Sequence, residues 1–208
     1  MGRTRIDGRK AGTNVRTPLA GLLLVQLVIG YEWLASGLTK LVRGNFPGGL
    51  ADELRERSEG AAGWYRSFLD GTVIPNAHAF GYLIEIAELA TGVALIGAAL
   101  AWLIAWERLP GGGRAALLLG TAAAAFAGIV MAVNFHLANG DAHPWGIPGE
   151  SFDEAVDLDS LIVAIQLIFL GVSAAAIASL RGQQQPTRPL AESTIERDGG
   201  RAGVPERR

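Results

Sequence analysis

Apolar residues along the chain gather in four long blocks, separated by more polar connections, at 18–41, 77–106, 114–137 and 158–180. Each block is close to the roughly 20 residues that an α-helix needs to cross a bilayer. The pattern therefore predicts an all-α polytopic membrane protein, built as a four-helix transmembrane bundle. The first block follows a basic segment, as a signal peptide would, but its length and the lack of a small-residue cleavage site favour a retained span.

The connections and ends of the chain predict three further features. In the first connection, the side chains of Trp64, Tyr65, Phe68 and Leu69 fit one face of a short amphipathic helix lying at the membrane interface. The stretch 71–75 begins with Gly71 and ends with Pro75, and it is expected to end that helix before the second span. Segments 1–17 and 182–208 lack apolar periodicity and are predicted to be disordered, which leaves 18–181 as the membrane domain.

Charge changes the picture through its distribution, because the net charge of the 208-residue chain is only −2. Basic residues gather before the first block, between the second and third, and after the fourth, at Arg3, Arg5, Arg9, Lys10, Arg16, Arg108, Arg114 and Arg181. The third connection, 138–157, has no Lys or Arg and holds five acidic residues. Lys and Arg near span ends tend to stay on the cytoplasmic side. The chain is therefore predicted to be a multi-pass protein of the plasma membrane with both termini in the cytoplasm.

Polar residues inside the blocks recur at helical spacing. They are Glu32, Ser36 and Lys40 in the first block, His78, Tyr82, Glu85, Glu88 and Gly92 in the second, Asn134 and His136 in the third, and Asp159, Gln166 and Ser173 in the fourth. Because a charge in mid-bilayer costs about 2.5–3.5 kcal/mol, such residues are expected to face the bundle interior. Together they predict a polar pocket that opens outward and has carboxylates at its floor.

Two interpretations of these carboxylates stay open at the level of sequence. Glu32 with Lys40 forms either an ordinary buried ion pair or part of a working site. Glu85 and Glu88 lie one turn apart with one obvious cation nearby, so one of them should hold a proton readily, as proton uptake or release requires. Alternatively, one of the two carboxylates faces a partner subunit.

The remaining candidate chemistry is limited. The chain has no cysteine, which excludes disulfides, thiolate-bound iron–sulfur clusters and covalently attached haem. His78 and His136 could approach each other as haem b ligands do, but hydrogen bonding in the pocket is the favoured role and we expect no haem b. No metal-binding motif, phosphate loop or hydrolase triad is present, and no nucleic-acid partner is predicted.

Two motifs carry a family resemblance. The first block ends in Ser36, Gly37 and Lys40 as Ser-Gly-x-x-Lys, and the second contains Glu88, Leu89 and Gly92 as Glu-Leu-x-x-Gly. Over about 18–181 the chain resembles the DoxX/DoxD family of four-span membrane proteins, which includes the DoxD-like subunit of thiosulfate:quinone oxidoreductase. The resemblance implies a membrane component that passes electrons from a reduced sulfur compound such as thiosulfate to quinone, with tetrathionate as the oxidised product.

Three functions follow as hypotheses. In the first, a membrane oxidoreductase subunit uses Glu85, Glu88 and Glu32 as its acidic catalytic groups and binds substrate through Lys40, His78, Asn134 and His136, with quinone as a second substrate entering between helices. In the second, the chain is a non-catalytic accessory subunit of a larger respiratory complex, and docks other membrane or periplasmic subunits through its outer connections. A complete transporter is disfavoured, since four spans lack the broken-helix repeats of such proteins.

Overall fold

The structure, a computed structural model, describes residues 16–140 and 157–184, and within them the secondary structure is helical without strands. Four long helices dominate, namely α1 (Arg16–Arg43), α4 (Ala77–Ala105), α5 (Gly111–Ala138) and α6 (Leu158–Gln184). Each is long and apolar enough to cross a membrane. The prediction of an all-α four-helix bundle is confirmed, and the helix ends lie within a few residues of the predicted blocks.

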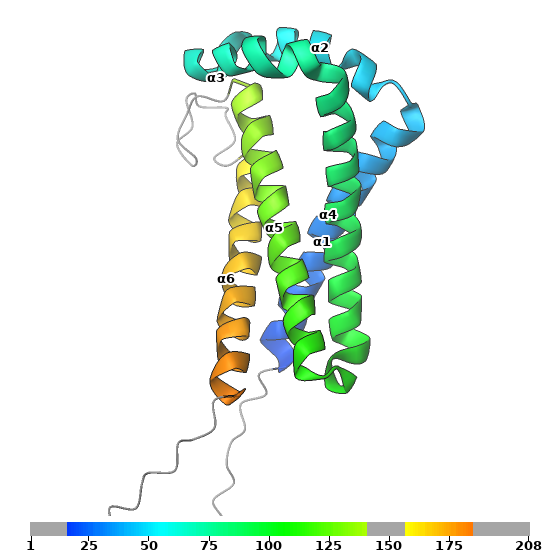
Figure 1. Cartoon of the computed structure of the whole chain (residues 1–208), viewed down its shortest axis with the longest axis vertical. Coiled ribbons are helices and arrows are strands. Elements are labelled where there is room, and N and C mark those ends of the chain that lie inside the picture. The colour runs from blue at the N-terminus through cyan, green and yellow to red at the C-terminus, as the bar shows by residue number, and fades with distance from the viewer. Residues whose placement is uncertain (1–15, 141–156, 185–208) are drawn as a thin grey trace, which may run out of the picture.

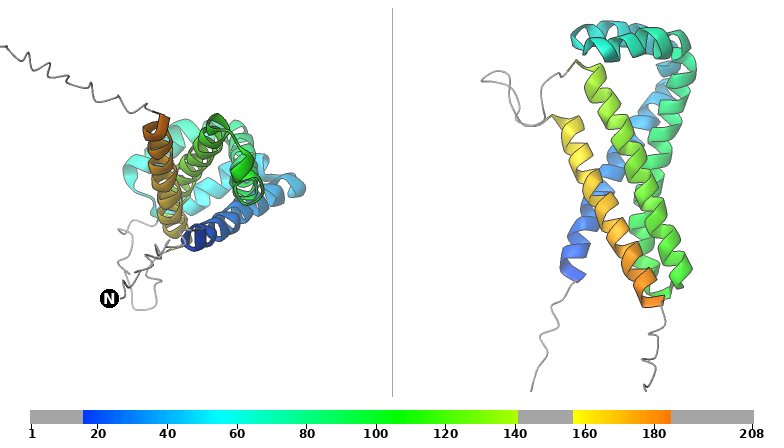
Figure 2. Two further views of the ribbon diagram at one scale, coloured as in Figure 1. Left: turned by 90° about the horizontal axis from the view of Figure 1, so that it is seen from below. Right: turned by 60° about the vertical axis from the view of Figure 1, so that its left-hand side comes forward.

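The helices pack as two antiparallel pairs, shown from several sides in Figures 1 and 2. The pair α1 and α4 and the pair α5 and α6 make the most extensive contacts, and α4 with α5 joins the pairs. Short helices cross one end of the bundle, which we call the capped end. At the opposite end, the termini end, α1 begins, α6 ends, and η4 (Trp106–Arg108) leads from α4 to α5.

The capped end contains more helix than the sequence predicted. Its elements are α2 (Phe46–Arg57), η1 (Ser58–Gly60), α3 (Gly63–Phe68), the π-helical turn η2 (Leu69–Val73) and η3 (Ile74–Asn76). The predicted short helix is present as α3; Tyr65 and Leu69 are buried, while Trp64 is 68% and Phe68 41% exposed. Helix α2 was missed because it buries only Pro47 and Leu50 and half of its other residues are charged.

The predicted break at 71–75 takes the form of a change of helix type, because α3 ends at Phe68 and π- and 3₁₀-helical turns lead to α4 at Ala77. The backbone stays helical through η2 and η3 and continues into α4. Pro75 is tolerated there because it lies in the first positions of η3, where a missing N–H removes no helical hydrogen bond. The predicted disorder of 1–17 and 182–208 concerns residues that mostly lie outside the described part; α1 already begins at Arg16 and α6 extends to Gln184.

An apolar core fills the bundle between all four long helices. It is built around Trp33 and Ile29 of α1, Leu95 of α4, Ala125 of α5 and Phe169 of α6. Small residues let the helices approach closely, as expected in lipid, where packing drives helix association. The core therefore fixes the positions from which polar side chains of α1 and α4 meet.

Candidate functional site

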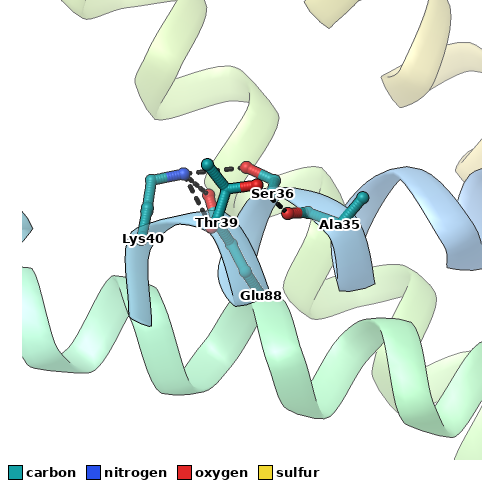
Figure 3. Close-up of polar contacts among 5 residues, drawn as sticks. All are labelled: Ala35, Ser36, Thr39, Lys40 and Glu88. Carbon is teal, nitrogen blue, oxygen red and sulfur yellow. Dashed lines mark hydrogen bonds and ion pairs between the residues drawn. The ribbon is translucent and has the colours of Figure 1, made fainter. Parts of the chain in front are cut away.

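Lys40 of α1 and Glu88 of α4 form the central ion pair of the bundle (Figure 3). The Lys40 ammonium donates to both carboxylate oxygens of Glu88 at 2.7 Å and to the Ser36 hydroxyl oxygen at 2.8 Å. The Glu88 side chain is fully buried and that of Lys40 is 21% exposed. Because the pair has lost most of its water, its attraction is much stronger than that of a surface pair.

Local helix geometry explains how α1 supplies this site. Ser36 and Lys40 are spaced i, i+4 and therefore share a face. The Lys40 ammonium also lies 5.1 Å from the centre of the Phe46 ring and 5.9 Å from that of Phe135, both within range of a cation–π attraction. The neighbouring Thr39 hydroxyl instead donates to the Ala35 carbonyl oxygen, as Figure 3 shows, so Thr39 does not hold the ammonium.

An open pocket of about 640 Å³ lies beside the ion pair, on the capped half of α1. Its polar lining consists of Glu32, Ser36, Thr39, Lys40, Arg43 and Asn45. Two cations therefore border the same space, and the buried Glu88 lies behind one of them. This pocket differs from the predicted one, because it lies along α1 and the start of α2, and of the three carboxylates expected at its floor only Glu32 is in its lining.

Glu85 is buried one helical turn from Glu88. Among the described residues, no side chain donates a hydrogen bond to the Glu85 carboxylate, whereas Glu88 accepts two from Lys40. The two carboxylates repel each other electrostatically. One lysine therefore neutralises one of two buried acids.

Two predicted site residues lie elsewhere. Glu32 is exposed on α1, where it lines the open pocket, so its predicted position in the bundle interior is wrong. His78 is exposed too, and its ring packs edge-on against Tyr82 at 5.0 Å. The inward face of α4 begins instead with Ala77 and Gly81, because α2 crosses there so closely that a Cβ on Gly81 would lie 2.5 Å from the Pro47 Cα.

Asn134 and His136 belong to a second polar cluster, at the capped end of α5. The Tyr65 hydroxyl lies 3.0 Å from the Asn134 side-chain oxygen and 3.1 Å from its carbonyl oxygen, and donates to both. His136 is buried, and its Nδ1 lies 3.3 Å from an oxygen of Asp157. These two predicted substrate residues therefore connect α5 to α3 and to the start of α6.

Asp157 completes that cluster at the N-terminus of α6. One carboxylate oxygen accepts from the Ser160 backbone N–H at 2.9 Å and the other from the Ser160 hydroxyl at 2.6 Å. Partial burial by itself raises the pKa of Asp157, but the hydrogen bonds from Ser160, together with His136, outweigh burial and lower the pKa below its ordinary value. The carboxylate thus stays charged where the helix dipole favours negative charge.

The structure also shows interior polar residues that the sequence analysis missed. Gln26 of α1 and Thr121 of α5 are buried, and with Ser173 of α6 they line a cavity of about 50 Å³ in the half of the bundle nearer the termini end. The Gln26 side-chain nitrogen donates to the Leu95 carbonyl oxygen at 2.9 Å. In the sequence, Gln26 and Thr121 each stand alone among apolar residues, without the helical spacing that identified the other polar residues of the blocks.

Within the described residues, no group of three or more His, Asp or Glu side chains is arranged to hold a metal ion. Comparisons with protein-family models, with curated proteins and with solved structures find no match for this chain.

Proposed function

We propose that this chain is a membrane oxidoreductase subunit that passes electrons from a reduced sulfur compound such as thiosulfate to a quinone, as its resemblance to the DoxX/DoxD family implies. One observation carries the proposal: the buried Lys40–Glu88 pair lies beside an open polar pocket that Arg43 also borders. Cations near the pocket attract an anionic substrate, and buried carboxylates behind it supply protons. An ordinary packing contact between two spans needs neither.

The chemistry balances without a protein thiol. Two thiosulfate dianions join through a new sulfur–sulfur bond to give tetrathionate and release two electrons, and the quinone takes up these two electrons and two protons. In this proposal Arg43 attracts the anion, and Glu88, assisted by Glu85, gives protons to the reduced quinone oxygens. The absence of cysteine fits a reaction in which sulfur never binds covalently to the protein.

The proposed orientation places the termini end in the cytoplasm of a plasma membrane. Arg108 and Arg114 lie at that end, and the sequence is basic before α1. Trp102 and Trp106 stack there with ring centres 4.8 Å apart, and the Arg114 guanidinium lies 5.2 Å from the Trp106 ring. Basic residues and interfacial Trp together favour a cytoplasmic membrane boundary.

Orientation can be tested directly because the chain has no native cysteine. Single cysteines at Ser67, in α3, and at Gly112, near the start of α5, lie at opposite ends of the bundle. In intact cells, a membrane-impermeant maleimide should label S67C, and G112C only after the membrane is permeabilised. The reverse labelling pattern would place the termini outside.

Activity is tested with the protein purified in mild detergent, with thiosulfate and a short-chain quinone as substrates and quinone absorbance as the readout. Glu88→Gln should lower kcat by about 100-fold or more, the typical contribution of a general acid. Glu53→Gln is the matched control, because Glu53 is a half-exposed acid on α2 that contacts Arg57. Unchanged turnover of E88Q, or no quinone reduction by the wild type, would refute the proposal.

Arg43 provides a second test that separates binding from proton transfer. Arg43→Ala should raise the KM for thiosulfate several-fold at low salt and much less at high salt, because the attraction of an exposed cation is screened. The kcat should change little. An equal loss at both salt concentrations would contradict attraction of the anion by Arg43.

A non-catalytic accessory subunit is the second candidate, and Glu32 is the observation that favours it. This carboxylate is exposed on α1, about 16 Å from the helix end at Arg43 at ~1.5 Å per residue, within the segment that can cross a membrane. A charge facing lipid is costly, and a cationic or hydrogen-bonding partner helix removes that cost. Stoichiometric recovery in a larger complex that E32Q dissociates, without activity of the isolated chain, would establish this alternative.

A further inference from the structure

Buried polar side chains continue through the bundle from Glu88 toward the termini end. Each is at most 7% exposed, and they come from all four long helices: Thr91, Gln166, Gln26, Thr121 and Ser173. Along α6, Gln166 and Ser173 are about 10 Å apart on one face. Polar groups inside a membrane bundle are costly unless each is hydrogen-bonded, so five of them in one interior require an explanation.

Gln166 is the most unusual member of this series. Its side chain is fully buried, and neither its amide nitrogen nor its amide oxygen has a hydrogen-bond partner in the described protein. The amide lies against Gly128, where a Cβ would be 2.0 Å from the Gln166 oxygen. Since buried amides are almost always hydrogen-bonded, two unpartnered atoms on one side chain indicate bound water.

Trp33 adds a second unpartnered group. The Trp33 indole nitrogen is buried and, among the described residues, also lacks an acceptor. Trp33 belongs to the same core as Ile162, Val163 and Phe169 of the α6 face on which Gln166 lies. It is also one turn from Gly37, whose Cβ position is 3.1 Å from the Cβ of Glu88. Trp33 therefore lies between the surroundings of Gln166 and those of Glu88.

The cavity nearer the termini end supplies room for water. Its volume of about 50 Å³ is lined by Gln26, Thr121 and Ser173 together with apolar side chains that include Phe169. A water molecule needs about 10–15 Å³ of such volume and two to four polar partners, so roughly three molecules fit. Phe169 lies three residues from Gln166 and four from Ser173 on the same helix, so the cavity and the unpartnered amide lie on one face of α6, about one helical turn on either side of this ring.

We propose that water held inside the bundle by Ser173, Thr121, Gln26 and Gln166 conducts protons from the termini end to Glu88. This inference rests on the proposed function, because each quinone reduced takes up two protons, and it assigns the side from which they come. A proton enters the water of the cavity, passes along hydrogen bonds past Gln166, and replaces the one that Glu88 gives to the reduced quinone. Gln166 orients the water and does not itself change protonation.

The first test measures hydration and needs no substrate. In isotope-labelled wild-type protein in liposomes, solid-state NMR follows the transfer of magnetisation from water to the Gln166 side-chain amide, which is assigned by its loss in Gln166→Leu. Transfer should approach that of the exposed Asn76 amide and exceed that of the exposed apolar Leu103 methyl groups at least several-fold. A Gln166 amide as slow as Leu103 would overturn the proton path, whatever the activity.

The second test measures proton delivery in proteoliposomes that reduce quinone. Gln166→Leu should lower kcat about tenfold and raise the solvent deuterium isotope effect, with the KM for thiosulfate unchanged. Ser173→Ala should have the same effects, and it serves as the independent test if Q166L does not fold. Leu167→Ala is the matched control, because Leu167 is 52% exposed on the outside of α6. Full turnover by both interior variants would overturn the path. Absence of quinone reduction in the wild type would instead refute the proposed function, while the hydration result still decides whether the path holds water.

Discussion

Gly37 of α1 packs directly against the backbone of Leu89 in α4: a Cβ on Gly37 would lie only 2.8 Å from the Leu89 nitrogen. No ordinary Cβ contact is that short, so only glycine fits between these helices. Gly37 lies one turn from Lys40, and Leu89 is the residue that follows Glu88. Close approach of the two backbones is therefore what lets the Lys40 ammonium reach the buried Glu88 carboxylate.

Gly37→Ala should destabilise the protein by about 1–3 kcal/mol, the range for overpacking a well-filled contact. The added methyl group meets backbone, which cannot move away as a flexible side chain would. Gly97→Ala is the matched control in α4, because a Cβ there meets nothing within 4 Å. Thermal unfolding in detergent should show a lower Tm for G37A and an equal or higher Tm for G97A. An equal decrease of Tm in both variants would mean that the close contact at Gly37 does not contribute to stability.

The Lys40–Glu88 pair predicts a specific pattern in a double-mutant cycle. Lys40→Met and Glu88→Gln should each destabilise the protein, and Lys40→Met more strongly, at about 3–5 kcal/mol, because it leaves a fully buried carboxylate without its cation. The double variant K40M/E88Q should be more stable than K40M, since no charge is then buried alone. Denaturation of all four proteins under one set of conditions measures the coupling.

A surface pair provides the control for that cycle. Arg55 and Asp52 form an ion pair at 2.7 Å on α2, with side chains 58% and 87% exposed. The same cycle at these positions should give a coupling of about 0.2–1 kcal/mol, since exposed pairs gain little. Coupling at Lys40 and Glu88 no larger than this would show that the buried pair is not the structural centre inferred here.

The sequence predicted the four long helices well because their signal is strong. In lipid, every backbone polar group needs an internal partner, so an apolar run of sufficient length forms a helix with few alternatives. The capped end was predicted less well, since α2 has no apolar face comparable with those of the spans. Helix α2 is held by contacts with α4, such as that of Pro47 with Gly81. The spacing of apolar residues in the sequence does not predict such contacts.

The candidate site was predicted in part, and the failures share one cause. Helical spacing places Glu32, Ser36 and Lys40 along one side of α1, but it does not determine how that side is turned toward α4. The close approach at Gly37 brings Ser36 and Lys40 toward Glu88 and leaves Glu32 outside. Likewise, His78 lies outside because α2 requires Gly81 at the interface. Which residue faces inward is thus decided by tertiary packing of small residues.

The effects of substitutions at Gly128 and Gln166 on stability should be coupled, because the two residues are in direct contact. Gly128→Ala places a methyl group where the Gln166 amide lies, and because that amide is fully buried it cannot swing into solvent. The loss should be about 1–3 kcal/mol. In Q166A the side chain that occupies this space is removed, so G128A should cost much less in that background. Gly120→Ala, with nothing within 4 Å of its Cβ, is the control, and Tm values of all variants test the coupling.

Asp157 predicts how stability responds to acid at the capped end. Its pKa is lower in the folded protein than the ordinary value of about 3.9, so its charge contributes stability above about pH 4 that disappears as the pH falls through the folded pKa. Asp157→Asn keeps an oxygen that accepts the Ser160 backbone N–H, and removes the charge together with the second oxygen, which accepts from the Ser160 hydroxyl. The Tm of the wild type should therefore exceed that of D157N at neutral pH, and the two should converge below about pH 4. Asp52→Asn, at an exposed surface pair, should show no such convergence; a wild-type advantage over D157N that stays constant down to the lowest pH would mean that the Asp157 charge is not linked to folding.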